Sequence, residues 1–378
     1  MNKKSEKTKK ALLPAEAGTL AGDDIYFFSS DYNLLYRVHI PELSVSVISH
    51  IPCEKVIAYR MFRKMRYWKD KLIMVPSWSE KIWIYDLSSR EWKDVAIEHP
   101  QITLKFWGSV IYQDDIFLFG AAYPAILKVN LNDYSVTYLE INSGTKGLFC
   151  TDAVRIDHMV YSPVSISNQI MWMNLDTLEY GWKQIGSAGN EYCGIAYDGN
   201  DFWIPSWQHG KIAKWDGHIQ WEEFELPEEI ASRRYLFTGA VCDGDRIRFL
   251  PIQDGKGLEI RKDISGKDRV TLTEETKKYI HMEHYEDGTI VLMRSDASLE
   301  VKWRGTWIKG RCEIDYKDFQ TYFCKKTLWD ILSEKGITTE TELFEMNDYI
   351  NMITKEPITT NDFLSEKIVG IHIWNLIE

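Results

Sequence analysis

The sequence predicts an all-β fold built from repeated four-stranded antiparallel units and followed by a small helical segment. A short apolar burst recurs at a nearly constant interval, and the same order of turns and strands follows each burst. Between residues 20 and 310 no apolar pattern of helical spacing is long enough for a helix. The 378 residues are 44% hydrophobic and 27% charged, an ordinary composition that can bury a large core.

The repeat is visible in the polar residue that opens each burst. The seven bursts are separated by 47, 44, 43, 43, 45 and 43 residues. Random apolar runs would not keep so regular a spacing over six intervals. The opening residues are Asp24, Lys71, Asp115, His158, Asp201, Arg246 and Thr289.

Each unit follows the same internal order, which the second unit shows best. The burst is followed by a loop, a second strand over 81–85, a polar turn, and a third strand from Trp92. A longer connection leads to a fourth strand over 107–112, which turns into the next burst. Several of these turns contain Asp-Gly, which tolerates the positive φ of tight hairpins. The unit is therefore a four-stranded antiparallel meander.

A repeated meander of ~40–50 residues is the pattern of a β-propeller blade. One blade is apolar on both faces and cannot bury either face alone, whereas a closed ring buries both between neighbours. Seven bursts predict a seven-bladed propeller over about residues 14–314, and a six-bladed ring with one irregular unit is the alternative. Residues 1–13 are expected to form a mobile, basic N-terminal tail.

One unit resembles the kelch motif, in which a tyrosine closes the second strand and a tryptophan follows after six intervening residues. Tyr85 and Trp92 have this spacing. The resemblance implies a kelch-like propeller, similar to the central domain of galactose oxidase. The double glycine of kelch units is absent, and 76–78 and 205–207 read Pro-Ser-Trp instead. The resemblance therefore carries over no catalytic residue.

The pattern changes after residue 314. Apolar residues recur at helical spacing from Phe319 to Leu332, and a second helix is expected over about 341–354. Residues 315–378 are therefore expected to form a helical C-terminal cap.

Charge and cysteine content exclude several functional classes. The net charge of −11 opposes binding to nucleic acid or to an anionic membrane. The six cysteines form no C-x-x-C pair, and no metal motif occurs, so neither a metal nor another cofactor is expected. No apolar run approaches the ~18 residues of a membrane span, and no signal peptide is recognisable, so we expect a cytoplasmic protein.

In a propeller, the loop after each burst and the connection into each inner strand lie on one face, around the mouth of the central channel. Aromatic and polar residues gathered there are what a ligand site needs. An exposed indole could stack on a sugar ring or grip a peptide side chain. The candidate ligand-binding residues on this face are Arg60, Arg63, Trp78, Trp107, Tyr192, Trp207, His209 and His281.

No nucleophile elbow or other catalytic signature is present, so no catalytic residue is assigned. The first hypothesis is a binding module whose partner is a peptide, a protein or a glycan. The alternative is a small-molecule enzyme of the epimerase, lyase or oxidase kind, with its site at the channel mouth.

Overall fold

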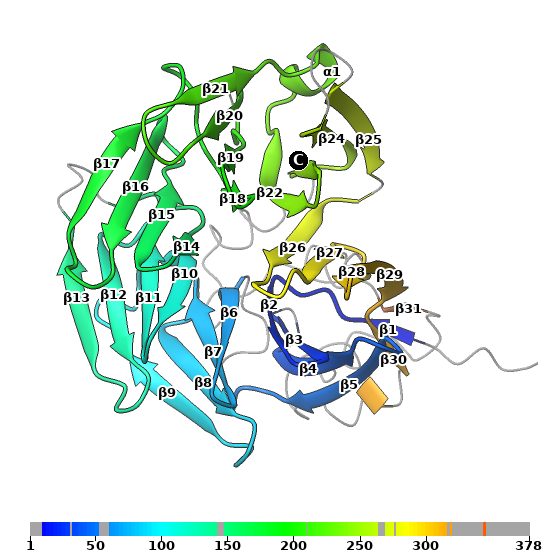
Figure 1. The fold of residues 1–378 in the computed structure, drawn as a ribbon. Helices are drawn as coiled ribbons and strands as arrows, with labels where there is room; N and C mark the ends of the chain where they lie inside the picture. The colour runs from blue at the N-terminus through cyan, green and yellow to red at the C-terminus, as the bar shows by residue number, and fades with distance from the viewer. Residues whose placement is uncertain are drawn as a thin grey trace, which may run out of the picture.

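The computed structural model describes residues 10–30, 32–52, 60–141, 147–208, 210–263, 269–275, 277–315, 318–319 and 343–344. Most of these residues belong to seven four-stranded antiparallel sheets, in each of which the strands follow one another in chain order. The sheets stand around a common axis as the blades of a propeller (Figure 1). The predicted all-β, seven-bladed fold is confirmed.

Blades one to four take their strands from the first half of the chain. Blade one contains β2 (Ala17–Ala21), β3 (Asp24–Ser29), β4 (Leu34–His39) and β5 (Ser44–Ser49). Blade two contains β6 (Phe62–Trp68), β7 (Lys71–Pro76), β8 (Lys81–Asp86) and β9 (Trp92–Ala96). Blade three contains β10 (Phe106–Tyr112), β11 (Asp115–Gly120), β12 (Ala125–Asn130) and β13 (Val136–Glu140). Blade four contains β14 (Val154–Ile156), β15 (Met159–Pro163), β16 (Gln169–Asn174) and β17 (Tyr180–Gln184).

Blades five to seven follow in the same order. Blade five contains β18 (Ala196–Tyr197), β19 (Phe202–Ile204), β20 (Ile212–Trp215) and β21 (Trp221–Phe224). Blade six contains β22 (Phe237–Asp243), β23 (Arg246–Pro251), β24 (Gly255–Arg261) and β25 (Val270–Glu275). Blade seven contains β26 (Tyr279–His284), β27 (Ile290–Arg294), β28 (Ser298–Trp303) and β29 (Thr306–Arg311). Every predicted burst is the second strand of its blade.

The hydrophobic core is divided among the blade interfaces. The buried apolar side chains of the described residues form seven clusters, and each cluster joins two neighbouring blades. Strand β27 shows how this arises, because Ile290 and Leu292 face blade six while Val291 and Met293 face blade one. Alternate side chains of a strand point to opposite faces, so a blade strand must be apolar throughout.

The ring is closed between blade seven and blade one. Strand β1 (Lys10–Leu12) pairs antiparallel with β30 (Glu313–Asp315), which follows blade seven. Leu13, which is fully buried, donates its amide to the carbonyl of Cys312 at 2.9 Å. The hydroxyl of Tyr36 in blade one donates to the carbonyl of Leu13 at 2.6 Å. Residues 10–13 thus close the ring, whereas the sequence pattern assigned them to the basic tail; residues 1–9 lie outside the described residues.

Helical structure differs from the sequence expectation in two places. Among the described residues of the propeller region there is one short helix, α1 (Glu228–Ala231), before blade six. Leu343–Phe344, expected within the second helix of the cap, instead form β31, parallel to β1. The rest of the predicted cap, apart from 315 and 318–319, lies outside the described residues. In the described part of the chain, no helix has the length and apolar character needed to cross a bilayer.

The closing contact can be tested with Leu13→Ala. Removal of this buried side chain should lower the free energy of unfolding by about 2–5 kcal/mol, because it leaves a cavity between the first and last blades. Urea unfolding followed by circular dichroism measures the change. The control is Ile166→Ala, since Ile166 is 50% exposed and should change stability by less than about 0.5 kcal/mol. Equal effects of the two substitutions would contradict this account of closure.

Candidate functional site

One face of the propeller is tied together by backbone hydrogen bonds that pass from blade to blade. The amide of Lys105 donates to Ser77, the amide of Ala121 to Lys105, and the amide of Phe149 to Ala121. Each bond joins a connection into an inner strand with a loop after a burst. On the other side of the ring, the amide of Leu236 bonds the carbonyl of Trp207 in the same way. The two kinds of loop therefore share one face, as predicted, and backbone hydrogen bonds connect them.

Most inner strands contain a register shift near the end that adjoins the loop face. In blades two, three, six and seven the register shifts by one residue, at Arg63, Trp107, Thr238 and Ile280. Blades four and five show the same shift between an isolated bridge and the inner strand, just after Cys150 and Tyr192. A β-bulge of this kind re-aims the side chain of the extra residue.

We call the residues at this position the mouth ring. In blade one the equivalent residue is Glu16, directly before the first paired residue of β2. The mouth ring consists of Glu16, Arg63, Trp107, Thr151, Cys193, Thr238 and Ile280.

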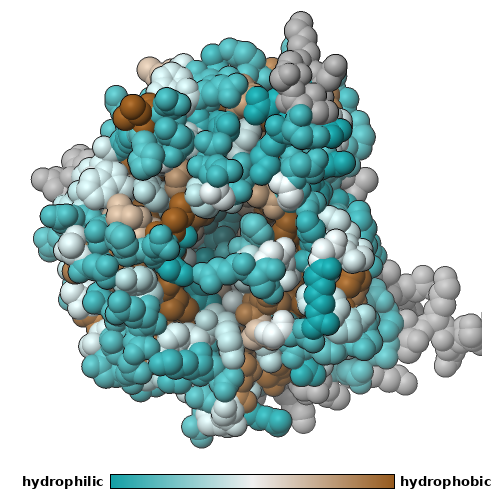
Figure 2. All heavy atoms as spheres, viewed as in Figure 1, coloured by the Kyte–Doolittle hydropathy of each residue, from teal (hydrophilic) through white to brown (hydrophobic). Residues whose placement is uncertain are grey.

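A cavity of about 30 Å³ lies inside the mouth ring. All mouth-ring residues except Trp107 line it, together with Lys64, Asp152, Tyr279, His281 and Met282. Figure 2 shows the corresponding hollow at the centre of the ring, bordered by hydrophilic and hydrophobic residues. The mouth ring therefore brings side chains of six blades to one cavity, five of them at a bulge.

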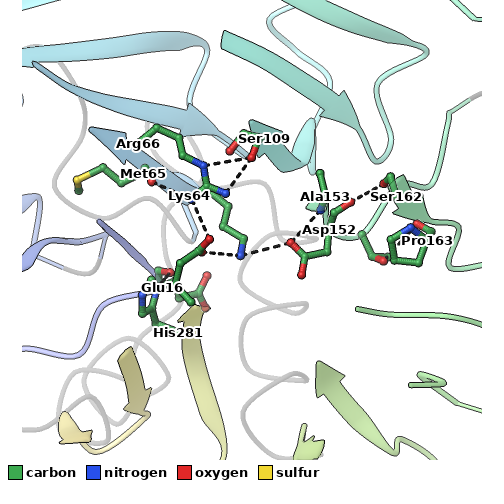
Figure 3. A network of polar contacts seen from close by, with 12 residues as sticks. Glu16, Lys64, Met65, Arg66, Ser109, Asp152, Ala153, Ser162, Pro163 and His281 are labelled. Atoms are coloured by element: carbon green, nitrogen blue, oxygen red, sulfur yellow. Dashed lines mark hydrogen bonds and ion pairs between the residues drawn. The ribbon is translucent and has the colours of Figure 1, made fainter. Parts of the chain in front are cut away.

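Lys64 spans the channel and connects three blades. Its Nζ lies 2.9 Å from Oε2 of Glu283 in blade seven and 3.5 Å from Oδ1 of Asp152 in blade four. Arg66, from the same strand as Lys64, reaches Oε1 of Glu283 at 3.1 Å and donates to the carbonyl of Ser109 in blade three. Figure 3 shows these side chains meeting in the channel. Ion pairs among these partly buried groups connect the inner strands across the channel.

The charge on Glu283 depends on these two cations. Burial alone would raise the pKa of its carboxyl, but Arg66 and Lys64 lower the pKa to about 2. Glu283 is therefore ionised at neutral pH. Removal of either cation would leave a buried negative charge with less compensation.

His281 lies next to Glu16 at the cavity and is 3% exposed. Its Nδ1 is 3.0 Å from the backbone carbonyl of Glu16. A carbonyl only accepts, so Nδ1 carries the proton and Nε2 has a free lone pair. No donor among the described residues bonds Nε2. Burial, assisted by Lys64 and Arg66, lowers the pKa of His281 to about 4, so the ring is neutral.

The rim of the cavity is basic and aromatic. The Nε of Arg60 pairs with Glu16 at 2.8 Å, and Nη1 of Arg63 lies 3.8 Å from the second oxygen of that carboxylate. The guanidinium of Arg63 lies over the indole of Trp107, 5.6 Å from the ring centroid. The sequence predicted all three of these basic and aromatic residues, and the structure brings them together with His281.

The other predicted residues that the structure describes do not line the cavity. Trp78 is partly buried, and its amide is bonded to the carbonyls of Arg60 and Met61 beside the rim. Trp207 is also partly buried and stacks on Tyr235, with ring centroids 5.7 Å apart. Tyr192, expected at the mouth, is instead fully buried, because its hydroxyl donates to the carbonyl of Ile185 inside the core. His209 lies outside the described residues.

Sequence reasoning missed the acidic half of the site. Glu16, Asp152 and Glu283 were not selected, although each lies on or beside an inner strand. The signal that could have found Glu16 is the mouth ring itself, since its members recur with the period of the blades. In a regular strand, Arg63 and Lys64 would point to opposite faces. The register shift at Arg63 instead allows both side chains to line the cavity.

The thiols near the site are poor nucleophiles. Cys193 donates to the carbonyl of Phe237 at 3.1 Å, and burial raises the pKa of its thiol strongly. Burial also raises the pKa of the Cys150 thiol to about 12. Within the described ranges, no three His, Cys, Asp or Glu side chains gather as a metal site would require.

Comparison with solved structures gives the fold. Virginiamycin B lyase from Staphylococcus aureus is 11% identical, with a TM-score of 0.61 over 78% of this chain and 97% of that chain. A catalytically inactive histidine-to-alanine variant of that lyase, solved with quinupristin, matches with the same TM-score. A chain of the mitotic checkpoint complex is 11% identical, with a TM-score of 0.56 over 80% of this chain and 93% of that chain.

BamB from Moraxella catarrhalis is 10% identical, with a TM-score of 0.54 over 78% of this chain and 85% of that chain. At such identities the likeness shows the propeller fold alone. No protein-family model and no curated protein matches the chain.

The buried histidine predicts a pH dependence of stability. Between about pH 6.5 and 4 the unfolded chain binds a proton at His281 that the folded protein does not, so stability should fall as pH falls through this window. The contribution is roughly 3 kcal/mol. Glu283 adds to the loss only at the lower end of this window, because its stabilisation is lost as pH falls through its unfolded pKa of 4.5 toward about 2.

Urea unfolding of the wild type and of His281→Gln at pH 4.5, 5.5, 6.5 and 7.5 measures this contribution. The variant should lose less stability over the range than the wild type. His158→Gln, a change at an exposed histidine, should retain the wild-type profile. Parallel profiles for all three proteins would show that His281 titrates normally in the folded state.

Proposed function

We propose that this propeller is a binding module whose ligand site is the mouth of the central channel on the loop face. The observation that carries the proposal is the cavity inside the mouth ring, with Trp107, Arg60 and Arg63 on its rim. A rigid concave site with aromatic walls and a few convergent polar groups is the usual form of a binding site. The ligand is a peptide, a protein segment or a glycan.

The local charge supports a role in recognition. The mouth contains four basic residues and three acidic ones, an excess of one positive charge in a chain whose net charge is −11. Such a local reversal steers a ligand toward one spot on a surface that otherwise repels anions. The basic residues are Arg60, Arg63, Lys64 and Arg66, and the acidic ones are Glu16, Asp152 and Glu283.

The chemistry of the site favours binding over catalysis. A general base works best when its pKa is near the working pH, and the pKa of His281 is about 4. The carboxylates of Glu16, Asp152 and Glu283 are engaged by arginine or lysine. The Cys193 thiol is protonated because burial raises its pKa.

The kelch-like motif contributes to packing in this proposal. Tyr85 and Trp92 face each other across β8 and β9, with ring centroids 4.9 Å apart, and belong to the cluster between blades one and two. We assign no ligand contact to this pair.

A double substitution tests the proposed site. Wild type is screened against peptide and oligosaccharide arrays, and each bound probe is measured by titration calorimetry. Trp78→Ala/Trp107→Ala should weaken binding of the bound probes at least 10-fold, because buried aromatic anchors carry a large share of binding energy. Trp221→Ala is the matched control, since Trp221 is 47% exposed on β21 and outside the mouth. Probes that bind both variants as tightly as wild type would place the binding site elsewhere.

The alternative, a small-molecule enzyme, rests on His281, which lines the cavity and whose buried Nε2 has no hydrogen-bond partner among the described residues. The similar lyase becomes inactive when a histidine is replaced by alanine. Quinupristin is the direct probe. A binding module should leave its chromatographic profile unchanged over a long incubation, whereas conversion that disappears in His281→Ala would replace the binding proposal with an enzymatic one.

A further inference from the structure

The outermost strand of each blade pairs with a neighbour on one side only. Its other side carries backbone N–H and C=O groups that a further strand could pair with, and proteins usually protect such an edge with charged side chains. Six of the seven outer strands carry at least one charged residue. These six strands are β9, β13, β17, β21, β25 and β29.

Strand β5, the outer strand of blade one, is the exception. Ser44–Ser49 reads Ser-Val-Ser-Val-Ile-Ser, which contains no charge and three β-branched residues. The strand lies on the outer rim of the ring (Figure 1). Strand β30 approaches it but pairs with β1, and no strand among the described residues pairs with the outer side of β5.

The usable length of this edge is set by a bulge. The register between β4 and β5 shifts after Ser49, because Leu35 pairs with Ser49 whereas Tyr36 pairs with Val47. Ile48 is therefore the extra residue, and a bulge of this kind bends an edge away from a new strand. The regular, uncharged edge consists of Ser44 to Val47.

This segment is complementary to itself. Val45 and Val47 pack on the cluster between blades seven and one, whereas Ser46 points to the other face of the strand. Two copies paired antiparallel about a two-fold axis at Ser46 would place each Val45 opposite Val47 of the other copy. Cross-strand pairs of β-branched residues stabilise a sheet, and a two-fold contact uses the same segment on both sides.

Charge determines where two copies of this chain can meet. Each copy has a net charge of −11, so association through most of the surface is opposed. An uncharged edge adds no like-charge contact and leaves no ion without its water. The outer strand is also the part of a blade farthest from the axis, so two rings can touch there edge to edge.

We propose that β5 is a self-association surface, at which Ser44–Val47 of two copies pair as antiparallel strands and join two blades into one continuous sheet. The contact is on the outer rim and uses no residue of the mouth ring. It is therefore a second interaction surface, independent of the proposed ligand site.

The first test is the mass of the full chain in solution. The contact is small, so association should be weak, and sedimentation velocity from about 5 to 500 µM should show a concentration-dependent change from one chain toward two. Association at 500 mM NaCl should be at least as strong as at 50 mM, because salt screens the repulsion between two negative copies. An interface of ion pairs would instead weaken with salt.

A charge at Ser46 tests the position of the contact. Ser46→Lys should weaken self-association at least 10-fold, because two lysines would meet at the two-fold axis beside Arg37, the residue paired with Ser46 on β4. Thr271→Lys is the matched control, since Thr271 is exposed on β25, an outer strand that already carries charge. This control should associate like wild type. Circular dichroism and the thermal midpoint compare the fold of the variants.

Complementation separates loss of the contact from loss of the fold. A trace of fluorescently labelled Ser46→Lys should sediment as one chain in an excess of unlabelled Ser46→Lys. In an excess of unlabelled Ser46→Glu it should sediment as a dimer, because opposite charges then face each other at the axis. A misfolded variant would not be rescued in this way.

Three results would overturn the inference. A wild type that remains one chain at every concentration would show that two copies do not pair through β5. Equal association of wild type and Ser46→Lys would place the contact on another surface. Failure of Ser46→Glu to recruit a folded Ser46→Lys chain would reject the two-fold pairing at Ser46. None of these results bears on binding at the channel mouth, which the Trp78→Ala/Trp107→Ala variant tests separately.

Discussion

The structure depends on the burial of both faces of every blade. A blade strand such as β27 sends apolar side chains to both sides, so each sheet is stable only between two others. Seven interblade clusters satisfy this requirement around the ring. Both faces of the first and last blades are buried only if the ring closes. The short strand β1 and the buried Leu13 make this closing contact.

Closure brings seven inner strands together at one axis, and this crowding creates the site. The chain has no room for a side chain at Gly194, just before β18, because a Cβ there would lie 2.8 Å from Cα of Gly239 in blade six. Where space remains, charged residues enter it and must find partners, because water is largely excluded. Lys64, Glu283 and Asp152 meet this need across three blades. The same contacts that neutralise these charges keep the cavity wall rigid.

The sequence predicted the fold well because the forces behind the fold are periodic. Each blade must bury apolar side chains on both faces, so the apolar strands and the turns between them recur at a regular interval in the sequence. That interval gives the number of blades. Prediction of the site was partial, since Arg60, Arg63, Trp107 and His281 were found and their acidic partners were not. Tyr192 was predicted at the mouth but is buried. The register shift that follows it decides which side chains of this segment face the channel, and the sequence of one blade does not reveal that shift. A single residue that breaks the two-residue period has no signature within one unit, and only alignment of all seven units exposes it.

The bulge also explains how a repetitive scaffold produces a specific site. Regular inner strands would present equivalent faces to the axis, and seven blades would give a nearly uniform lining. An extra residue in blades two to seven, and the residue before β2 in blade one, instead aim a separate position at the mouth, outside the regular packing between the blades. That position is Glu16 in blade one, Arg63 in blade two and Trp107 in blade three, three side chains of different chemistry at one structural location. The blades thus share the apolar pattern that maintains the fold, whereas the mouth-ring position carries a different residue from one blade to the next.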